Sequence, residues 1–195
     1  MDHSDAIKIG LKSGHTHTEI ARKVYLGYPT SAFIGNEELE YLIINKISKY
    51  FQIPYSNVQV VGSAKLGFSC HKENKFNPAT SDLDIAIINK DLFFKYIEIV
   101  YEKTNGYGDQ SGFPKNEFGV SRYGEYIKYI ARGIFRPDLM PSCMKKAEWR
   151  TFFTQLSAQH SSYFKSINCG IYSTEFFFES KQKNNISEYK SRSGL

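Results

Sequence analysis

Two carboxylates and a glycine–serine pair are the residues of this chain whose types and spacing point to chemistry. Asp82 and Asp84 stand two positions apart at the start of an apolar run that continues to residue 88. A run this short, rich in β-branched residues and preceded by turn-forming residues, is typical of a buried strand. Because alternate side chains of a strand share a face, we expect the two carboxylates to project side by side.

Gly62 and Ser63 supply the complementary part, because they end a second short apolar run over residues 58–61. A glycine lets the backbone approach a phosphate, and amide groups exposed in a tight turn or at a helix start bind anions. Two adjacent carboxylates repel each other and favour a neutralising cation, and their oxygen atoms favour Mg²⁺ or Mn²⁺. The combination predicts metal-assisted phosphoryl or nucleotidyl transfer.

A purely structural interpretation of the same residues is also available. Gly62 and Ser63 would form an ordinary turn at the end of a strand, and Asp82 would cap a local segment, as turn residues commonly do. This interpretation leaves the pairing of the two carboxylates unexplained. We therefore favour the functional one.

The order of these residues resembles the pattern of the DNA polymerase β-like nucleotidyltransferase superfamily. The pattern is a Gly-Ser turn, a further glycine and then a strand opening with Asp-x-Asp, seen here as Gly62-Ser63, Gly67 and Ser81-Asp82-Leu83-Asp84. The resemblance covers about residues 58 to 88, and the nearest relatives look like minimal nucleotidyltransferases and bacterial nucleotide-second-messenger synthases. It implies an α+β (α/β-like) fold with a small mixed sheet and helices packed on it. The residues that it implies are Asp82 and Asp84 for Mg²⁺ or Mn²⁺, and Gly62, Ser63, Lys65 and Ser81 for the nucleotide.

The resemblance also implies a reaction and its partners. An enzyme of this kind moves a nucleoside monophosphate from a nucleoside triphosphate to an acceptor hydroxyl on protein, RNA or a nucleotide. Relatives occur in bacterial toxin–antitoxin and antiphage systems, so a partner protein in a defence complex is implied as well. The alternative is a degenerate subunit that binds nucleotide, nucleic acid or a partner protein without catalysis. A plain DNA- or RNA-binding domain is the third interpretation.

Active members of the superfamily resemble two-metal enzymes with a third acid on a neighbouring strand. The downstream sequence has no unambiguous acid within an apolar strand. Asp138 sits beside Pro137, which disfavours a central strand. Glu175 follows the run at 167–172, which we expect to be a strand, although an acid also suits a helix N-terminus. We favour Glu175 over Asp138, and without either residue one metal ion could still hold a triphosphate.

Bulk composition bounds the remaining possibilities. A chain of 195 residues with 41% hydrophobic content predicts a single domain, residues 36–195, after an N-terminal helical or irregular extension over residues 1–35. No run approaches the length of a bilayer span, and no secretory pattern opens the chain, which predicts a cytoplasmic protein without membrane contact. The net charge of +5 favours polyanionic ligands. Three dispersed cysteines predict neither a disulfide framework nor a zinc site.

Helices and loops must position these residues. Capping-box spacing between Thr16 and Glu19 predicts a helix over residues 17–26. A longer helix begins near Asn36, and helical periodicity predicts two more over residues 91–103 and from residue 123. The apolar face of the helix after Asn36 should contain Leu39, Leu42, Ile43, Ile47, Tyr50 and Phe51.

Three segments leave alternatives open. The loop at 68–80, with His71, Lys72, Glu73 and Lys75, is either a substrate loop or a solvated excursion. The basic segment 132–150 ends in a helix carrying Lys145, Lys146 and Arg150, and it lines either an anion channel or a solvated surface. After residue 172, either a terminal helix begins at Glu175 or the strand continues to residue 178.

Overall fold

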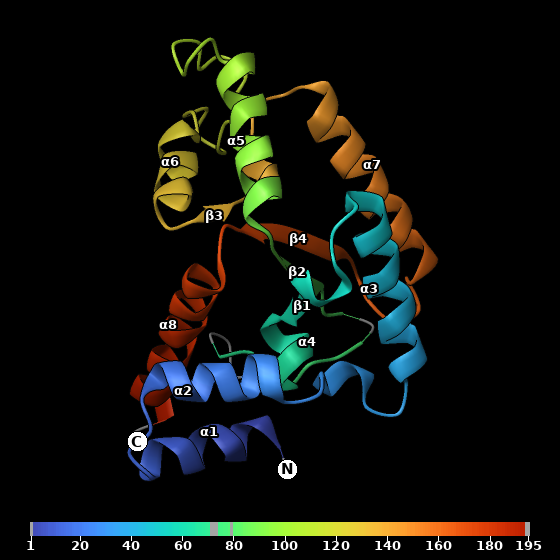
Figure 1. Cartoon of the computed structure of the whole chain (residues 1–195), viewed down its shortest axis with the longest axis vertical. Coiled ribbons are helices and arrows are strands. Elements are labelled where there is room, and N and C mark those ends of the chain that lie inside the picture. Colours follow the sequence, from blue (N-terminus) through green and yellow to red (C-terminus); the bar gives the residue numbers. More distant parts are fainter. Residues whose placement is uncertain (1, 71–73, 79, 194–195) are drawn as a thin grey trace.

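A four-stranded mixed β-sheet lies at the centre of the molecule (Figure 1). The computed structural model describes residues 2–70, 74–78 and 80–193. The strands are β1 (Val58–Val61), β2 (Leu83–Ile88), β3 (Ile134–Phe135) and β4 (Ile167–Tyr172), in the spatial order β1-β2-β4-β3. β2 runs antiparallel to β1 and parallel to β4, and β3 is antiparallel to β4. The expected α+β class with helices on a small mixed sheet is confirmed.

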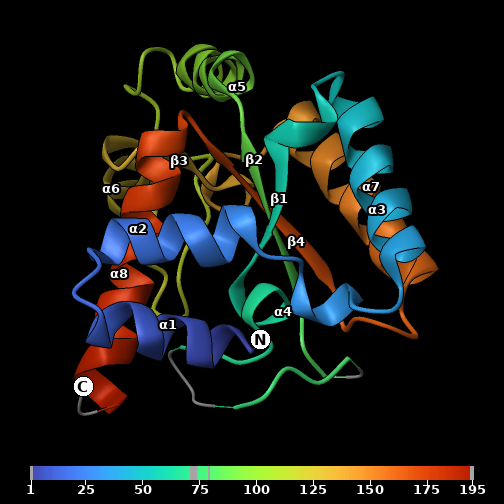
Figure 2. The ribbon, with the colours of Figure 1, turned by 60° about the horizontal axis from the view of Figure 1, so that its bottom comes forward.

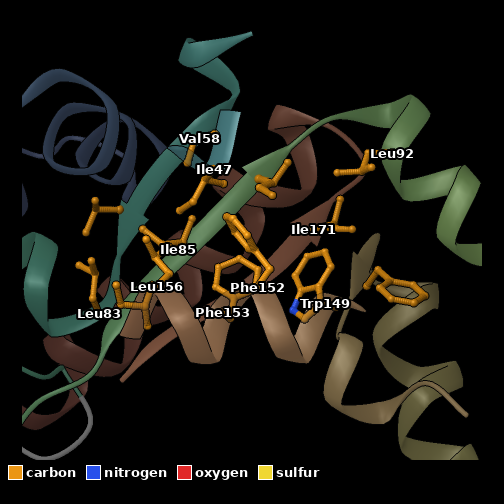
Figure 3. Packing of buried hydrophobic residues seen from close by; sticks show 14 of the residues in the cluster. Ile47, Val58, Leu83, Ile85, Leu92, Trp149, Phe152, Phe153, Leu156 and Ile171 are labelled. Atoms are coloured by element: carbon orange, nitrogen blue, oxygen red, sulfur yellow. The ribbon is translucent and has the colours of Figure 1, made fainter. Parts of the chain in front are cut away.

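One face of the sheet buries the larger apolar core. Leu83, Ile85 and Ile87 of β2 point into it, as the alternation of a strand requires. Helices α3 (Glu37–Phe51), α5 (Lys90–Lys103) and α7 (Met144–Gln159) contribute to this core. Figure 3 shows Trp149 and Phe153 of α7 directed toward the strands. Aromatic rings therefore fill much of the space between α7 and the sheet.

The opposite face is covered by elements from the two ends of the chain (Figure 2). They are α1 (His3–Lys12), α2 (His17–Arg22) and α8 (Glu175–Ser193), which share a second apolar cluster with Ala86 and Tyr172 of the sheet. The Arg22 guanidinium donates to the Glu179 carboxylate with its Nε 2.5 Å from Oε1. The first and last helices of the chain thus form one layer.

The N-terminal extension is more regular than its polar sequence suggests. The predicted capping box between Thr16 and Glu19 is confirmed at the start of α2, and a π-helical turn (Lys23–Gly27) continues it. The irregular segment expected before it contains α1, whose buried Ile7 packs in the second cluster. The extension therefore has a helix that its weak periodicity did not predict.

Three further expectations are resolved by the elements themselves. α3 begins after Asn36 as expected, but Leu42 and Tyr50 are exposed rather than on its buried face. The segment after residue 172 is a helix, α8, and the alternative of a longer strand is wrong. α5 and α6 (Tyr123–Ala131) match the predicted helices.

The segment expected to be only a loop after α6 contains the two-residue strand β3. It pairs with Ile171 and Tyr172 at one end of β4. Pro137, which begins a 3₁₀ turn (Pro137–Leu139), has no N–H to extend the ladder. Residues 167–170 of β4 therefore have no strand neighbour on that side among the described residues.

Candidate active site

Asp84 lies in the middle of the sheet, between two strands. Its backbone pairs with Val61 of β1 on one side and with Asn168 of β4 on the other. Because the neighbouring Leu83 and Ile85 point into the main core, the carboxylate of Asp84 projects from the opposite face. It is partly buried there.

Gly62 is in direct contact with this carboxylate. It is the first residue of α4 (Gly62–Leu66) and has a φ of +68°. A Cβ atom built on Gly62 would lie 2.8 Å from Oδ2 of Asp84. Both the left-handed backbone and this close approach require glycine. The turn and the carboxylate, which are 22 positions apart in the sequence, therefore form one structural unit.

Asp82 lies one residue before β2, at the same end of that strand as Asp84. Its Oδ1 accepts a hydrogen bond of 2.8 Å from the hydroxyl of Ser166, which directly precedes β4. The negative charge of Asp82 also raises the pKa of Asp84. The two carboxylates are thus close enough to interact, as their spacing predicted.

The charge on Asp84 is poorly compensated. Burial, followed by the charge of Asp82, raises the pKa of Asp84 to about 6, while a hydrogen bond with the Asn168 side chain acts in the opposite direction. No cationic side chain contributes to this balance within the described residues. A partly buried carboxylate without a positive partner favours the binding of a cation or a proton, because either one neutralises its charge.

The donor set around Asp84 fits one divalent cation. The carboxylates of Asp82 and Asp84 are oxygen donors, and Mg²⁺ is commonly held by one or two carboxylates together with substrate phosphates. Across residues 2–70, 74–78 and 80–193, no three His, Cys, Asp or Glu side chains gather to hold a metal ion.

Asn168 occupies the position, next to Asp84 on the neighbouring strand, where a third acid was expected. The preference for Glu175 is wrong, because Glu175 is an exposed residue of α8 beyond the opposite end of β4. Asp138 does border the same cavity as Asp84. However, its two oxygens accept hydrogen bonds of 3.0 and 2.7 Å from the Arg136 guanidinium.

Lys65 does not take the phosphate-binding position expected of it. Its side chain is 5% exposed, and its Nζ donates a 2.6 Å hydrogen bond to the backbone carbonyl of Tyr28. Burial lowers the pKa of Lys65 to about 8. Lys65 therefore fastens α4 to the N-terminal extension instead of facing a ligand.

The other expected nucleotide contacts have different surroundings. Ser63 is a partly buried residue in the only turn of α4. The hydroxyl of Ser81 accepts a 3.1 Å hydrogen bond from the backbone N–H of Asn77, which orders the preceding loop. Lys75 is exposed, whereas the predicted loop residues His71, Lys72 and Glu73 lie outside the described part of the chain.

A cavity of about 1080 Å³ opens beside the unpaired part of β4 and includes Gly62, Asp84 and Asn168 in its lining. Residues of α6, α7 and α8 and of the turn after β3 form its other walls. The α8 wall, with Lys181, Gln182 and Asn185, was not expected from the sequence. Since α8 carries no regular apolar stripe, only its tertiary packing could reveal which residues face the cavity.

Comparison with protein-family models, with curated proteins and with solved structures gives no match to this chain. Among residues 2–193 as described, none of the helices combines the length and apolarity needed to cross a bilayer. The chemistry of the site therefore has to be argued from its own geometry.

Replacing Gly62 by alanine should destabilise the protein more than the same change at Gly14. Both have positive φ, but a Cβ at Gly14 would meet nothing within 4 Å. We expect Gly14→Ala to lower the free energy of unfolding by about 1–2 kcal/mol, and Gly62→Ala by about 1–3 kcal/mol more, because Asp84 must move. Urea denaturation of both variants and of Gly62→Ala/Asp84→Ala measures this. An extra loss that Asp84→Ala does not relieve would contradict the proposed contact.

The stability of the metal-free protein should fall as the pH rises toward 6 because of Asp84. The pKa of Asp84 is raised from 3.8 to about 6, so in this window the folded chain binds the proton that the unfolded chain has released. We expect the free energy of unfolding of wild type, relative to Asp84→Asn, to decrease by up to ~3 kcal/mol between these pH values. Urea titrations in EDTA test this. A flat difference for Asp84→Asn would overturn the assignment.

Proposed function

We propose that this protein is a metal-dependent nucleotidyltransferase. It binds a nucleoside triphosphate at Asp82, Asp84 and the Gly62 turn and transfers the nucleoside monophosphate to an acceptor hydroxyl. The observation that carries the proposal is the contact between Gly62 and the uncompensated carboxylate of Asp84. The start of α4 therefore lies directly beside a partly buried acid, and both border a cavity large enough for a nucleotide.

The transfer is a substitution at phosphorus. The acceptor oxygen forms a bond to the α-phosphorus while the bond from that phosphorus to the bridging oxygen breaks. Pyrophosphate leaves with the electron pair, and the proton of the hydroxyl passes to solvent. Asp82 and Asp84 would hold a divalent cation, which would neutralise phosphate charge in this step.

The residues of the chain contribute position and charge. Gly62 leaves room for the Asp84 carboxylate beside the start of α4 because it has no side chain. Ser166 holds Asp82 through its hydroxyl, and Asn168 hydrogen-bonds to Asp84. These contacts fix the two carboxylates before substrate binds, which is how preorganised sites lower a barrier.

Removal of both carboxylates should abolish transfer. Asp82→Asn/Asp84→Asn keeps the shape of the side chains but removes the charges that hold the cation. Incubation with each α-labelled nucleoside triphosphate, Mg²⁺ or Mn²⁺ and total RNA or lysate shows which molecule becomes labelled. Wild type and the exposed control Asp91→Asn should both label it. Undiminished labelling by the double variant would refute the mechanism.

A second candidate, binding without catalysis, is favoured by Asn168. An amide there cannot take a proton from an attacking hydroxyl, as a third carboxylate could. The chain would then bind a nucleotide, a nucleic acid or a partner protein through the same site and sense it rather than transform it. Wild-type protein that binds nucleotide but labels no acceptor would support this candidate.

Introducing an acid at position 168 separates the two candidates. If the wild type is inactive, Asn168→Asp should raise labelling from background by at least about tenfold, because it adds a general base next to Asp84. Asn168→Ala, which removes the amide without adding charge, should give no gain. Comparable activity of wild type and Asn168→Asp would instead favour the transferase and exclude the binding-only candidate.

A further inference from the structure

One flank of α7 presents a line of polar side chains to the cavity. Lys146, Arg150, Thr154 and Ser157 recur at intervals of four, four and three residues and all line the cavity. Residues at this spacing share one flank of a helix. We call these four residues the α7 stripe. Trp149, Phe152, Phe153 and Leu156, on a neighbouring flank of α7, are buried in the core.

The two cations of the α7 stripe are arranged unfavourably in the free protein. Like charges four residues apart destabilise a helix, and Arg150 contributes to a lowered pKa of Lys146, although burial is the main cause. Nζ of Lys146 donates to the backbone carbonyls of Asp138 and Met140, at 3.2 and 2.5 Å. Arg150 is exposed, and no described residue forms an ion pair or hydrogen bond with it.

Asp138 offsets the charge of Lys146 only in part, because it also pairs with Arg122 and Arg136. Asp138 is engaged by Arg136, whose guanidinium also lies 4.9 Å from the centre of the Tyr129 ring. On the α8 wall, Lys181 is 3.5 Å from Oδ1 of Asn185. The cavity wall around Arg150 is therefore positive, and an anionic ligand would relieve the repulsion within it.

Strand order separates this positive wall from the Gly62 turn. Gly62 follows β1, Asp84 is on β2, and α7 is tied to β4, because the hydroxyl of Ser157 accepts a 2.8 Å hydrogen bond from the N–H of Ile167. Arg150 is two helical turns before Ser157, or about 10 Å along the axis. In strand order, Asp84 thus lies between the Gly62 turn and the β4 edge, and it lines the same cavity as the α7 stripe.

In-line phosphoryl transfer places the attacking and leaving oxygens on opposite sides of the phosphorus. With the leaving pyrophosphate at the Gly62 turn, the acceptor must approach from the β4 side, where the α7 stripe lies. We propose, on the basis of the proposed function, that the α7 stripe binds the acceptor through a nucleotide phosphate and that Arg150 is its main contact. The acceptor is then a nucleotide chain end or a free nucleotide, whose hydroxyl oxygen bonds to the α-phosphorus as pyrophosphate departs.

The test measures acceptor and triphosphate binding separately in the full chain. The acceptor probe is a short 5′-fluorescein-labelled single-stranded RNA with a free 3′ hydroxyl, followed by fluorescence anisotropy. The donor probe is a fluorescent nucleoside triphosphate analogue with Mg²⁺. We expect Arg150→Ala to weaken RNA binding about five- to tenfold at low salt and to reduce the salt slope by about one. Its affinity for the triphosphate should be unchanged.

Two variants control for charge and fold. Lys145→Ala removes a neighbouring cation that pairs with Glu148 at 2.7 Å and does not line this cavity, so both affinities should stay at the wild-type values. Arg150→Lys retains the charge and should restore part of the RNA affinity. An equal loss in Lys145→Ala and Arg150→Ala would mean that only overall charge is sensed, which overturns the proposal.

Several outcomes decide the matter. Unchanged RNA affinity in Arg150→Ala, or a loss of triphosphate affinity in its place, overturns the assignment of the α7 stripe, and so does the absence of any nucleotide binding to wild type. An unlabelled dinucleotide is then added to compete with the labelled RNA, which distinguishes a free nucleotide from a chain end as the acceptor. Either result of this competition supports the proposal. Failure of the proposed function would appear separately, as triphosphate binding that Asp84→Asn does not weaken.

Discussion

The contact between Gly62 and Asp84 is the constraint around which the proposed site is built. It brings the end of β1 against a carboxylate on β2, in a space where even one methyl group would collide with an oxygen atom. The neighbouring Asp82 and the surrounding protein both oppose ionisation of Asp84. An acid in this position lowers the stability of the fold, since an apolar residue would fill the same space without the desolvation penalty. Such local conflicts are expected at functional sites.

The rest of the fold holds this contact in place from two sides. On one face, the aromatic core under α7 and the apolar residues of β2 fix the strand itself. On the other, Lys65 fastens the helix that begins with Gly62 to the carbonyl of Tyr28 in the N-terminal extension. The extension that seemed peripheral in the sequence therefore helps to position the glycine turn. The amine of Lys65 is also among the few charged groups that are buried within the described residues.

Much of the architecture follows from local sequence patterns, and much of the site does not. Alternating apolar residues and turn signals suffice to predict β2 and β4, and capping residues predict α2. The exposure of Leu42, by contrast, depends on which neighbours α3 meets, and β3 is too short for any periodicity. The sequence does not distinguish Asn168 and Arg150 from other polar residues. Only the strand register and the orientation of α7 place both of them around one cavity. Lys65 shows the converse error, because a residue next to a motif that predicts phosphate binding can still donate to the backbone of another segment.

The layer over the Asp84 face has a consequence for how the chain matures during synthesis. Arg22 and Glu179, which join α2 to α8, are separated by 157 positions, so this layer closes only after residue 179 has been synthesised. Until then Ala86, and Tyr172 once it has emerged, lack the cover of the final helix. Contacts of such long range slow folding and prolong the exposure of apolar surface. The cavity beside Asp84, which α8 lines, is therefore among the last parts of the molecule to be completed during synthesis.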